Sequence, residues 1–481
     1  MEKKKSIGFG GRGWLLVFYQ MFAYAAFSAF TSYPQNTLGA DFISTQVLTW
    51  VYTGASIVAV ILQFFVFAPR MGRIKSIKWM GLIFGFITIA SALGVMLIPG
   101  DPTGKNIGTI VFWYVAYVIL TISSVLWSSF FVTVLIGNWF PRRRGTVMGI
   151  ATFAFPIVNG LLLTVFMFAS GTYGRFWAFS PFLLIAIIGI LFCLLFITDY
   201  PEQCGCFRDN DKNMTAEVAN AMLMAELEAK KNTVWTRKKV FGLRDTWFLV
   251  LSEAFILLSS VGMMVQIVSV LGEYEGELSA LAFSTMDSGM FLFLCFGQGS
   301  FTILTGISIF ALLGSWLLGM IDTKFGTKTA IIITACIMFI AGVLGAVHNV
   351  YCILIACLCL ALFMGAASNY GLSGFARYWR REDFASVFAA CAPVGCILQA
   401  FGPTFISTLA TVEGLKLGGL TLSGYSVSFA FVAFLAVVSF ILILLFNPKH
   451  VIEVDNKLRA ERGLVVDDEL VKRLEAEKVK K

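Results

Sequence analysis

The sequence predicts an all-α membrane protein with twelve transmembrane helices, arranged as two pseudo-symmetric bundles of six. Of its 481 residues, 58% are hydrophobic and only 13% are charged, which is far from the composition of soluble proteins. Apolar stretches long enough to cross a bilayer recur twelve times, since a spanning helix needs about 20 mainly apolar residues. One polar stretch separates the first six from the last six.

The predicted spans follow one another with short connections. They cover residues 14–33, 46–68, 79–98, 109–136, 146–169, 176–198, 246–271, 298–320, 329–347, 350–375, 384–411 and 423–446. We take the first as an uncleaved helix, because it is long enough to span and no convincing small-residue cleavage site follows it.

The net charge of +8 is distributed as a membrane topology requires. If the N-terminus is inside, 33 of the 36 Lys and Arg residues fall on cytoplasmic segments, and only Lys105, Arg175 and Lys416 fall outside. Loop Lys and Arg set orientation, so we expect both termini to be cytoplasmic. This pattern indicates a multi-pass plasma-membrane protein in contact with the lipid bilayer, and it argues against nucleic-acid binding.

Four regions follow from the apolar pattern: a first bundle at 1–198, a cytoplasmic central loop at 199–245, a second bundle at 246–446 and a charged cytoplasmic tail at 447–481. Residues 217–231 and 467–480 have helical spacing and many charges. We expect solvated or membrane-surface helices there, with partner-binding elements as the alternative.

The two halves repeat each other's loops. A cationic, glycine-bearing turn follows the second span at Pro69–Lys75 and the eighth at Gly319–Lys328. Asn138-Trp-Phe-Pro-Arg-Arg-Arg144 precedes the fifth span, and Arg377-Tyr-Trp-Arg-Arg381 precedes the eleventh. Repeated six-helix halves related by an axis along the membrane normal are the plan of major facilitator transporters.

The chain thus resembles the major facilitator superfamily over nearly all of its length. Its 8–9 loop resembles the signature loop of that superfamily, and Gly149 to Gly160 resembles the glycine–proline motif of the fifth helix. The resemblance implies that these loops stabilise one conformation. The conformational-gate candidates are Asp322 and Gly326 in the second half and Arg70, Gly72 and Arg73 in the first.

Three further segments resemble the oxalate:formate antiporter-like family. They are Asn138-Trp-Phe-Pro-Arg142, Tyr200-Pro-Glu-Gln-Cys-Gly205 with the residues up to Asp211, and Asp245-Thr-Trp-Phe248. Members of that family that exchange dicarboxylates use an arginine in the eighth helix and a lysine in the eleventh. This chain has no cation in 302–321 or 384–411, so dianion exchange by that mechanism is not expected.

Glu253 is the one ionisable residue clearly inside a predicted span, about 10 Å from the start of the seventh helix. An acid at that depth suggests a proton-coupling site. The alternative is a glutamate at the cytoplasmic interface that reaches water or Arg244.

The resemblance implies that the first, fourth, seventh and tenth helices line a central cavity. Their polar and aromatic residues are candidates for solute binding, with two from the fifth and eleventh helices added. Helix–helix hydrogen bonding or plain packing is the alternative for each one. The candidates are Gln20, Tyr24, Tyr117, Trp127, Asn159, Gln266, Asn369, Tyr370 and Gln399.

The predicted function is secondary transport of a small organic solute by alternating access, with an organic anion or monocarboxylate as the substrate class and protons as a possible partner. A neutral or aromatic solute is the first alternative, and a transporter-like membrane sensor is the second. Neither of the two histidines has a catalytic partner nearby in sequence, so we expect no enzyme. We also expect no cofactor and no metal. The sequence leaves the oligomeric state open and favours a monomer. Cys204 and Cys206 lie in the central loop, where we expect reduced thiols.

Overall fold

The computed structural model describes most of the chain. The described residues are 9–37, 45–67, 70, 75–98, 106–140, 144–211, 233–280, 303–417 and 420–464, with isolated positions between 215 and 228. The statements below concern these residues.

The first half contains six helical spans. They are α1 (Gly11–Thr37); α3 (Thr45–Ile61) with the π-helix η1 (Leu62–Phe67); α4 (Ile77–Leu97); α5 (Ile107–Val125) with the π-helix η3 (Leu126–Phe131) and α6 (Val132–Trp139); α7 (Arg144–Ala151) with α8 (Ala154–Pro156), the π-helix η4 (Ile157–Leu162) and α9 (Leu163–Tyr173); and α10 (Arg175–Phe196).

The second half repeats this order. Its spans are α13 (Arg244–Val265) with α14 (Ile267–Gly272); α17 (Ile303–Phe325); α18 (Thr327–Ala346); α19 (Val350–Ala367) with α20 (Tyr370–Tyr378); α21 (Arg381–Leu409); and α22 (Tyr425–Leu445). Short elements complete the described chain: η5 (Pro201–Cys204), η6 (Arg208–Asn210), α12 (Arg237–Gly242), α15 (Glu275–Ala280), the antiparallel strands β1 (Leu415–Leu417) and β2 (Leu420–Leu422), and α23 (Pro448–Ala460).

The all-α membrane architecture is confirmed. Eleven helical stretches of the described chain are long and apolar enough to cross a bilayer. The predicted fifth span is missing from that set because several short segments, α7 to α9, replace one long helix there. Pro156 lies among them, and proline removes a backbone donor inside a helix.

Four spans are predicted to line the cavity: the first, fourth, seventh and tenth. The last three of these are each interrupted by a stretch that is not regular α-helix. The fourth span contains η3, the seventh breaks at Gln266, and the tenth breaks at Ser368–Asn369. The fifth span contains η4 as well. Such irregular turns expose backbone groups and often mark functional sites.

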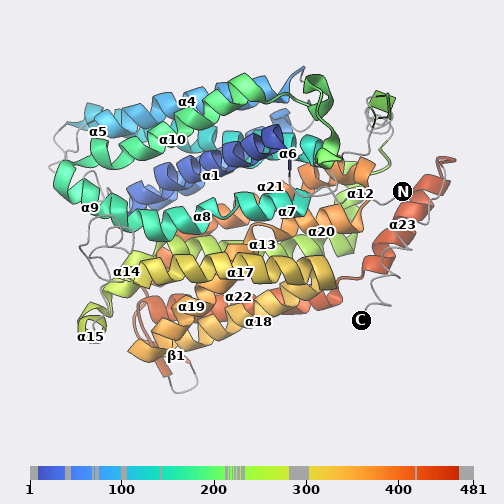
Figure 1. Ribbon diagram of the computed structural model, residues 1–481. Coiled ribbons are helices and arrows are strands. Elements are labelled where there is room, and N and C mark those ends of the chain that lie inside the picture. The colour runs from blue at the N-terminus through green and yellow to red at the C-terminus, as the bar shows by residue number, and fades with distance from the viewer. Residues whose placement is uncertain are drawn as a thin grey trace.

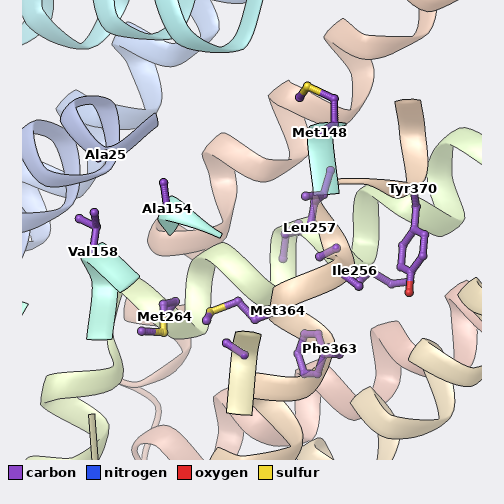
Figure 2. Packing of buried hydrophobic residues seen from close by; sticks show 14 of the residues in the cluster. Ala25, Met148, Ala154, Val158, Ile256, Leu257, Met264, Phe363, Met364 and Tyr370 are labelled. Atoms are coloured by element: carbon purple, nitrogen blue, oxygen red, sulfur yellow. The ribbon is translucent and has the colours of Figure 1, made fainter. Parts of the chain in front are cut away.

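The two halves lie side by side in the view of Figure 1, with the early helices α1, α4, α5 and α10 above and α17, α18, α19 and α22 below. Buried apolar side chains from both halves fill the seam between them, and Figure 2 shows part of this packing. Among the residues labelled there, Ala25, Met148, Ala154 and Val158 come from the first half, and Ile256, Leu257, Met264 and Met364 from the second.

Two hydrogen-bonded contacts also cross the seam. Thr53 of α3 donates to the carbonyl of Ala400 at 2.8 Å, and its hydroxyl lies 2.8 Å from that of Thr404 on α21. Thr152, between α7 and α8, donates to Asn369 Oδ1 at 3.2 Å. The halves are therefore joined by polar bonds at two separate levels of the bundle.

The first turn of α1 and helix α23 lie at the same end of the molecule, which we call the terminal end (Figure 1). Residues 199–211 pack against the first half there, and 233–243 lead into α13 of the second half. Arg237 of α12 crosses back to the first half: it donates to the carbonyl of Phe64 at 2.9 Å, and its guanidinium lies 4.3 Å from that ring centre.

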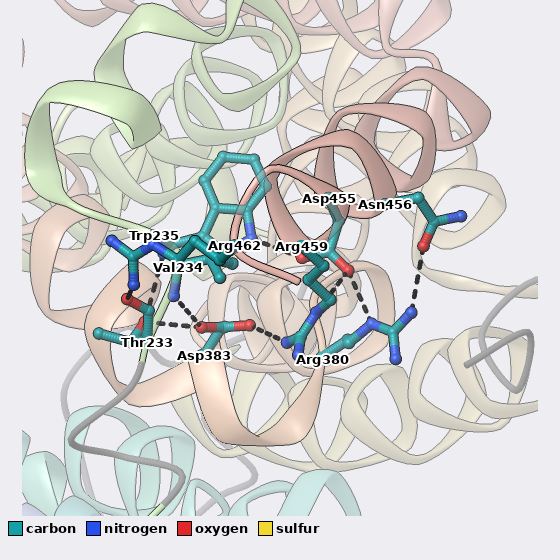
Figure 3. Close-up of polar contacts among 9 residues, drawn as sticks. All are labelled: Thr233, Val234, Trp235, Arg380, Asp383, Asp455, Asn456, Arg459 and Arg462. Atoms are coloured by element: carbon teal, nitrogen blue, oxygen red, sulfur yellow. Dashed lines mark hydrogen bonds and ion pairs between the residues drawn. The ribbon is translucent and has the colours of Figure 1, made fainter. Parts of the chain in front are cut away.

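Helix α23 is fixed under the second half by four buried charges, shown in Figure 3, which we call the clamp: Arg380, Asp383, Asp455 and Arg459. Arg380 Nε lies 2.7 Å from Asp455 Oδ2, and Arg459 Nη2 contacts Asp383 Oδ2 at 2.5 Å. Asp383 also accepts from Thr233 in the central loop. This part of the predicted tail therefore has one buried face, packed at the terminal end of the second half, and 465–481 lies outside the described residues.

Candidate functional site

Glu253 is held deep in the second half by α13. Its residue exposure is only 9%, and its carboxyl lies against the backbone of Gly371 in α20. A Cβ at Gly371 would collide with the carboxyl oxygens, so the contact depends on glycine.

Glu253 has no Lys, Arg or His paired with it in the described part of the chain. Arg244, one of the two partners named in the interfacial alternative, instead lies 3.8 Å from Asp245 Oδ2, with a side chain that is 72% exposed. A carboxyl so placed has no cation to neutralise it.

The break in the tenth span gives the Glu253 carboxyl a backbone partner. Helix α20 begins at Tyr370, and its N-cap residue Asn369 makes no side-chain capping bond. The first turn of a helix carries unpaired N–H groups and a partial positive charge. The Gly371 N–H faces Glu253, so an acid from α13 caps a helix that does not cap itself.

A matching contact exists in the first half. Gln20 lies nine residues after the first residue of α1, as Glu253 does after the first residue of α13. Ser128 lies 21 residues after the first residue of α5, as Gly371 does after that of α19. Gln20 Nε2 donates to the carbonyl of Ser128, within η3, at 2.8 Å.

The eleventh span adds one side chain near Glu253, and that side chain connects it to a tyrosine of the second span. Cys396 of α21 lies close enough to interact electrostatically with Glu253, Tyr24 and Tyr52. We call Gln20, Tyr24, Tyr52, Glu253 and Cys396 the central cluster. It joins residues of both halves, and Glu253 is its one acid.

Three candidates of the first half make helix–helix hydrogen bonds. Tyr117 donates to the Thr31 carbonyl at 2.8 Å, and Trp127 Nε1 donates to the Tyr19 hydroxyl at 2.8 Å. Asn159 Nδ2 contacts Ser28 Oγ at 2.5 Å. These bonds supply the packing role that the sequence left as the alternative.

The candidates of the second half differ in the partners that they contact. Tyr370 bonds Thr334 at 2.5 Å, and Gln266 accepts from Tyr425 at 3.0 Å, both within the half. Asn369 instead accepts from Thr152 across the seam, at the break of the tenth span. Gln399 is half-buried on α21.

The signature-loop candidates are joined to α20. Asp322 Oδ1 accepts from Thr327 Oγ1 at 2.6 Å, and Arg377 donates to the Asp322 carbonyl at 2.9 Å. Gly326 has a φ of +98°, a region that favours glycine, and its α-carbon faces the Arg377 guanidinium. The nine-residue helix α20 therefore contacts Glu253 near one end and the 8–9 loop at the other.

The first-half loop is described only in part. Arg70 is exposed and donates to the Val66 carbonyl of its own span at 2.9 Å. Gly72 and Arg73 lie outside the described residues.

Sequence reasoning missed four members of this arrangement: Ser128, Gly371, Cys396 and Tyr52. The Ser128 contribution is a backbone carbonyl, and Gly371 contributes through the absence of a side chain. The signal that could have found Ser128 and Gly371 is the register between halves, since counting from the helix starts pairs Gln20 with Glu253 and Ser128 with Gly371.

No family model matches the sequence, and no curated protein matches it. Solved structures do match. The major facilitator proton:xylose symporter XylE, bound to 6-bromo-6-deoxy-D-glucose, aligns with a TM-score of 0.62 at 17% identity, over 90% of this chain and 95% of XylE.

Two other solved structures are similar over comparable lengths. The human organic anion transporter MFSD10 gives a TM-score of 0.60 at 13% identity, covering 90% of this chain and 100% of that one. A variant of the nucleoside transporter NupG gives 0.53 at 13% identity, covering 90% and 98%. Identities this low establish the fold alone, and by that measure the chain has the fold of the major facilitator superfamily.

Proposed function

We propose that the chain is a secondary transporter that moves a small organic solute across the plasma membrane by alternating access of its two halves. The fold supports this, since the similar structures are a proton:xylose symporter, a nucleoside transporter and an organic anion transporter. The seam supports it too, because its polar bonds at Thr53 and Thr152 can break and form separately.

The observation that carries the proposal is the burial of Glu253, which has no cation partner among the residues that the structure describes. Burying an unpaired carboxylate costs several kcal/mol. The protonated acid avoids most of that cost, whereas the ionised form needs water or a cation. An acid in this position takes up a proton in the closed state and releases it when one side opens, which couples solute movement to protons.

For the substrate, we propose a monocarboxylate or similar organic anion that moves together with a proton. The described parts of the eighth and eleventh spans carry no Lys or Arg in 303–323 and 384–409 that could neutralise a dianion. A monocarboxylate and one proton together carry no net charge. The resemblance to the oxalate:formate antiporter-like family supports an anion, with a neutral or aromatic solute as the alternative given Tyr24 and Tyr52 in the central cluster.

The gate in this proposal is the 8–9 loop. Asp322 and Arg377 tie that loop to α20, and α20 contacts Glu253. A change at Glu253 can therefore bias a two-state equilibrium at the terminal end. We place both termini on the cytoplasmic side, from the distribution of Lys and Arg.

The test is the Glu253→Gln variant in proteoliposomes, because glutamine imitates the protonated acid. Exchange of solute should continue, and accumulation driven by a pH gradient should fall at least tenfold. Glu453→Gln, the same change at an exposed position of α23, is the matched control and should behave like the wild type. Full gradient-driven uptake by Glu253→Gln would rule out the coupling role, and a protein that binds solutes without moving them would favour the sensor.

A further inference from the structure

Two cysteines outside the transport pathway lie together at the terminal end of the first half. Cys204 ends η5, Gly205 turns the chain with a φ of +72°, and Cys206 follows. Both are free and half-buried. The Cys204 thiol donates to the Pro201 carbonyl at 3.2 Å, and the Cys206 thiol lies close enough to affect its titration.

The segment that carries them is fixed in place. Asp199 accepts from the backbone N–H of Lys78 at 2.7 Å, and Trp139 Nε1 donates to the Thr198 carbonyl at 2.8 Å. A buried ion pair, with Arg208 Nε 2.5 Å from Glu202 Oε1, joins the residues on either side of the two cysteines. The thiols are therefore held at a defined position against the first half.

Arg12, in the first turn of α1, gives this pair a positive charge. Its Nη1 donates to the Cys204 carbonyl at 3.0 Å, which places the guanidinium charge beside the Cys204 thiol. Partial burial by itself raises the pKa of Cys204, but hydrogen bonds from Thr198, Arg12 and Cys206 outweigh it and leave the pKa lowered. Burial and the neighbouring Cys204 raise the pKa of Cys206.

The two thiols are thus unequal. A partly exposed cysteine beside an arginine is the usual setting of a reactive thiolate, and a second thiol within reach can resolve the product. The described part of the chain places no third His, Cys, Asp or Glu here that would complete a metal site.

We propose that Cys204 and Cys206 form a reversible thiol–disulfide switch, in which Cys204 attacks and Cys206 resolves. The co-reactant is a low-molecular-weight disulfide such as oxidised glutathione. The Cys204 thiolate attacks one glutathione sulfur, forms a mixed disulfide and expels the other glutathione as a thiolate, which takes up a proton. The Cys206 thiol then loses its proton and attacks the Cys204 sulfur, releasing the second glutathione. In total, two protein thiols are oxidised and one glutathione disulfide is reduced to two thiols.

The switch acts on α1, because Arg12 belongs to that helix and contacts Cys204 directly. The disulfide removes the thiolate that Arg12 faces and closes a ring across Gly205. The first helix carries Gln20 and Tyr24 of the central cluster, so oxidation alters the anchoring of a helix that the proposed transport cycle moves.

The experiment treats the full-length protein in detergent with oxidised glutathione and maps the products by peptide mass spectrometry. The wild type should give the Cys204–Cys206 disulfide and release two glutathiones per protein. The Cys206→Ser variant should instead retain one glutathione, on Cys204. These readouts are chemical and independent of transport, so they can fail while the proposed function holds.

Alkylation by iodoacetamide measures the reactivity of each thiol. Thiolate is the nucleophile, so at pH 7 Cys204 should react about tenfold faster than Cys206. The rate for Cys204 should also reach its plateau at a lower pH than the rate for Cys206 does. Arg12→Gln should slow Cys204 at least threefold, while Arg237→Gln, a matched change on α12, should not. Glutathione found first on Cys206, or Cys204 reacting no faster than Cys206, would overturn the proposal.

Discussion

The two halves use the same geometry for different chemistry at their centres. In the first half an amide, Gln20, donates to the backbone carbonyl of Ser128. At the equivalent place in the second half an acid, Glu253, faces the backbone of Gly371. The amide keeps its proton at any pH, whereas the acid can gain and lose one. The repeat therefore supplies the same backbone geometry in both halves. The presence of Glu253 where the first half has Gln20 supplies the titratable group.

The repeat extends to side chains at the terminal end. Lys78 is the second residue of α4 and donates to the Leu194 carbonyl at 3.0 Å. Lys328 is the second residue of α18 and donates to the Leu444 carbonyl at 3.1 Å. Leu194 and Leu444 both lie 19 residues after the first residue of their helices, α10 and α22. Agreement this close makes the departures between the halves informative.

The largest expected effect concerns Gly371. In Gly371→Ala the new methyl group collides with the Glu253 carboxyl, which is the end of a flexible side chain and can move away. The protein should fold, but Glu253 loses its place, so pH-driven accumulation in proteoliposomes should fall at least tenfold.

The equivalent change in the first half is Ser128→Ala. It should keep accumulation within about twofold of the wild type, because Gln20 bonds the main-chain carbonyl rather than the serine side chain. Equal losses in the two variants would show that the halves do not differ in the way described.

The fold could be predicted because hydropathy alone sets the spans. Each predicted range overlaps its helix, and the differences are mostly a few residues at the ends. The interruptions could not be predicted, since the tenth span stays apolar up to Ala367 and only the structure shows that regular helix ends there. The same holds for α23, whose charged sequence suggests solvent exposure while Asp455 and Arg459 are buried in the clamp.

The candidate site was predictable only where a side chain is unusual for its surroundings. Glu253 stands out because it is an acid in an apolar helix. Its partner does not, because any of several glycines could allow a close approach, and the choice of Gly371 depends on how α13 crosses α20. Polar residues such as Tyr117 and Asn159 look alike in sequence whether they bind a solute or a neighbouring helix.

An intermediate effect is expected from the charges at the terminal end. Asp383 is fully buried and accepts from Thr233, the Val234 N–H and Arg459. Asp383→Asn removes a negative charge that neutralises the buried Arg459 guanidinium. It should therefore lower the free energy of unfolding by about 3 to 5 kcal/mol.

The first-half counterpart is Glu202→Gln. It should cost less, about 1 to 3 kcal/mol, because Glu202 accepts one described hydrogen bond, from Arg208, whereas Asp383 accepts three. Thermal unfolding in detergent followed by tryptophan fluorescence would compare the two variants. A larger loss from Glu202→Gln would mean that the clamp is not the stronger of the two attachments.

The smallest expected effect separates the two lysine caps. The Lys328 ammonium donates to two carbonyls at the end of the twelfth span, Leu444 and Phe446, the second at 2.6 Å. Among the described residues, the Lys78 ammonium donates to one carbonyl, that of Leu194. A cation at a helix C-terminus gains from both the hydrogen bonds and the helix dipole. Replacement of Lys328 by Met should therefore cost about 2 kcal/mol and that of Lys78 about 1 kcal/mol. Arginine at either position keeps the charge and should recover most of the loss, which distinguishes a cap from simple packing of the lysine stem. Unfolding curves of the four variants, measured in the same detergent, would test this. Equal losses of stability in the two methionine variants would show that the second carbonyl adds nothing. The caps of the two halves would then be equivalent in energy as well as in position.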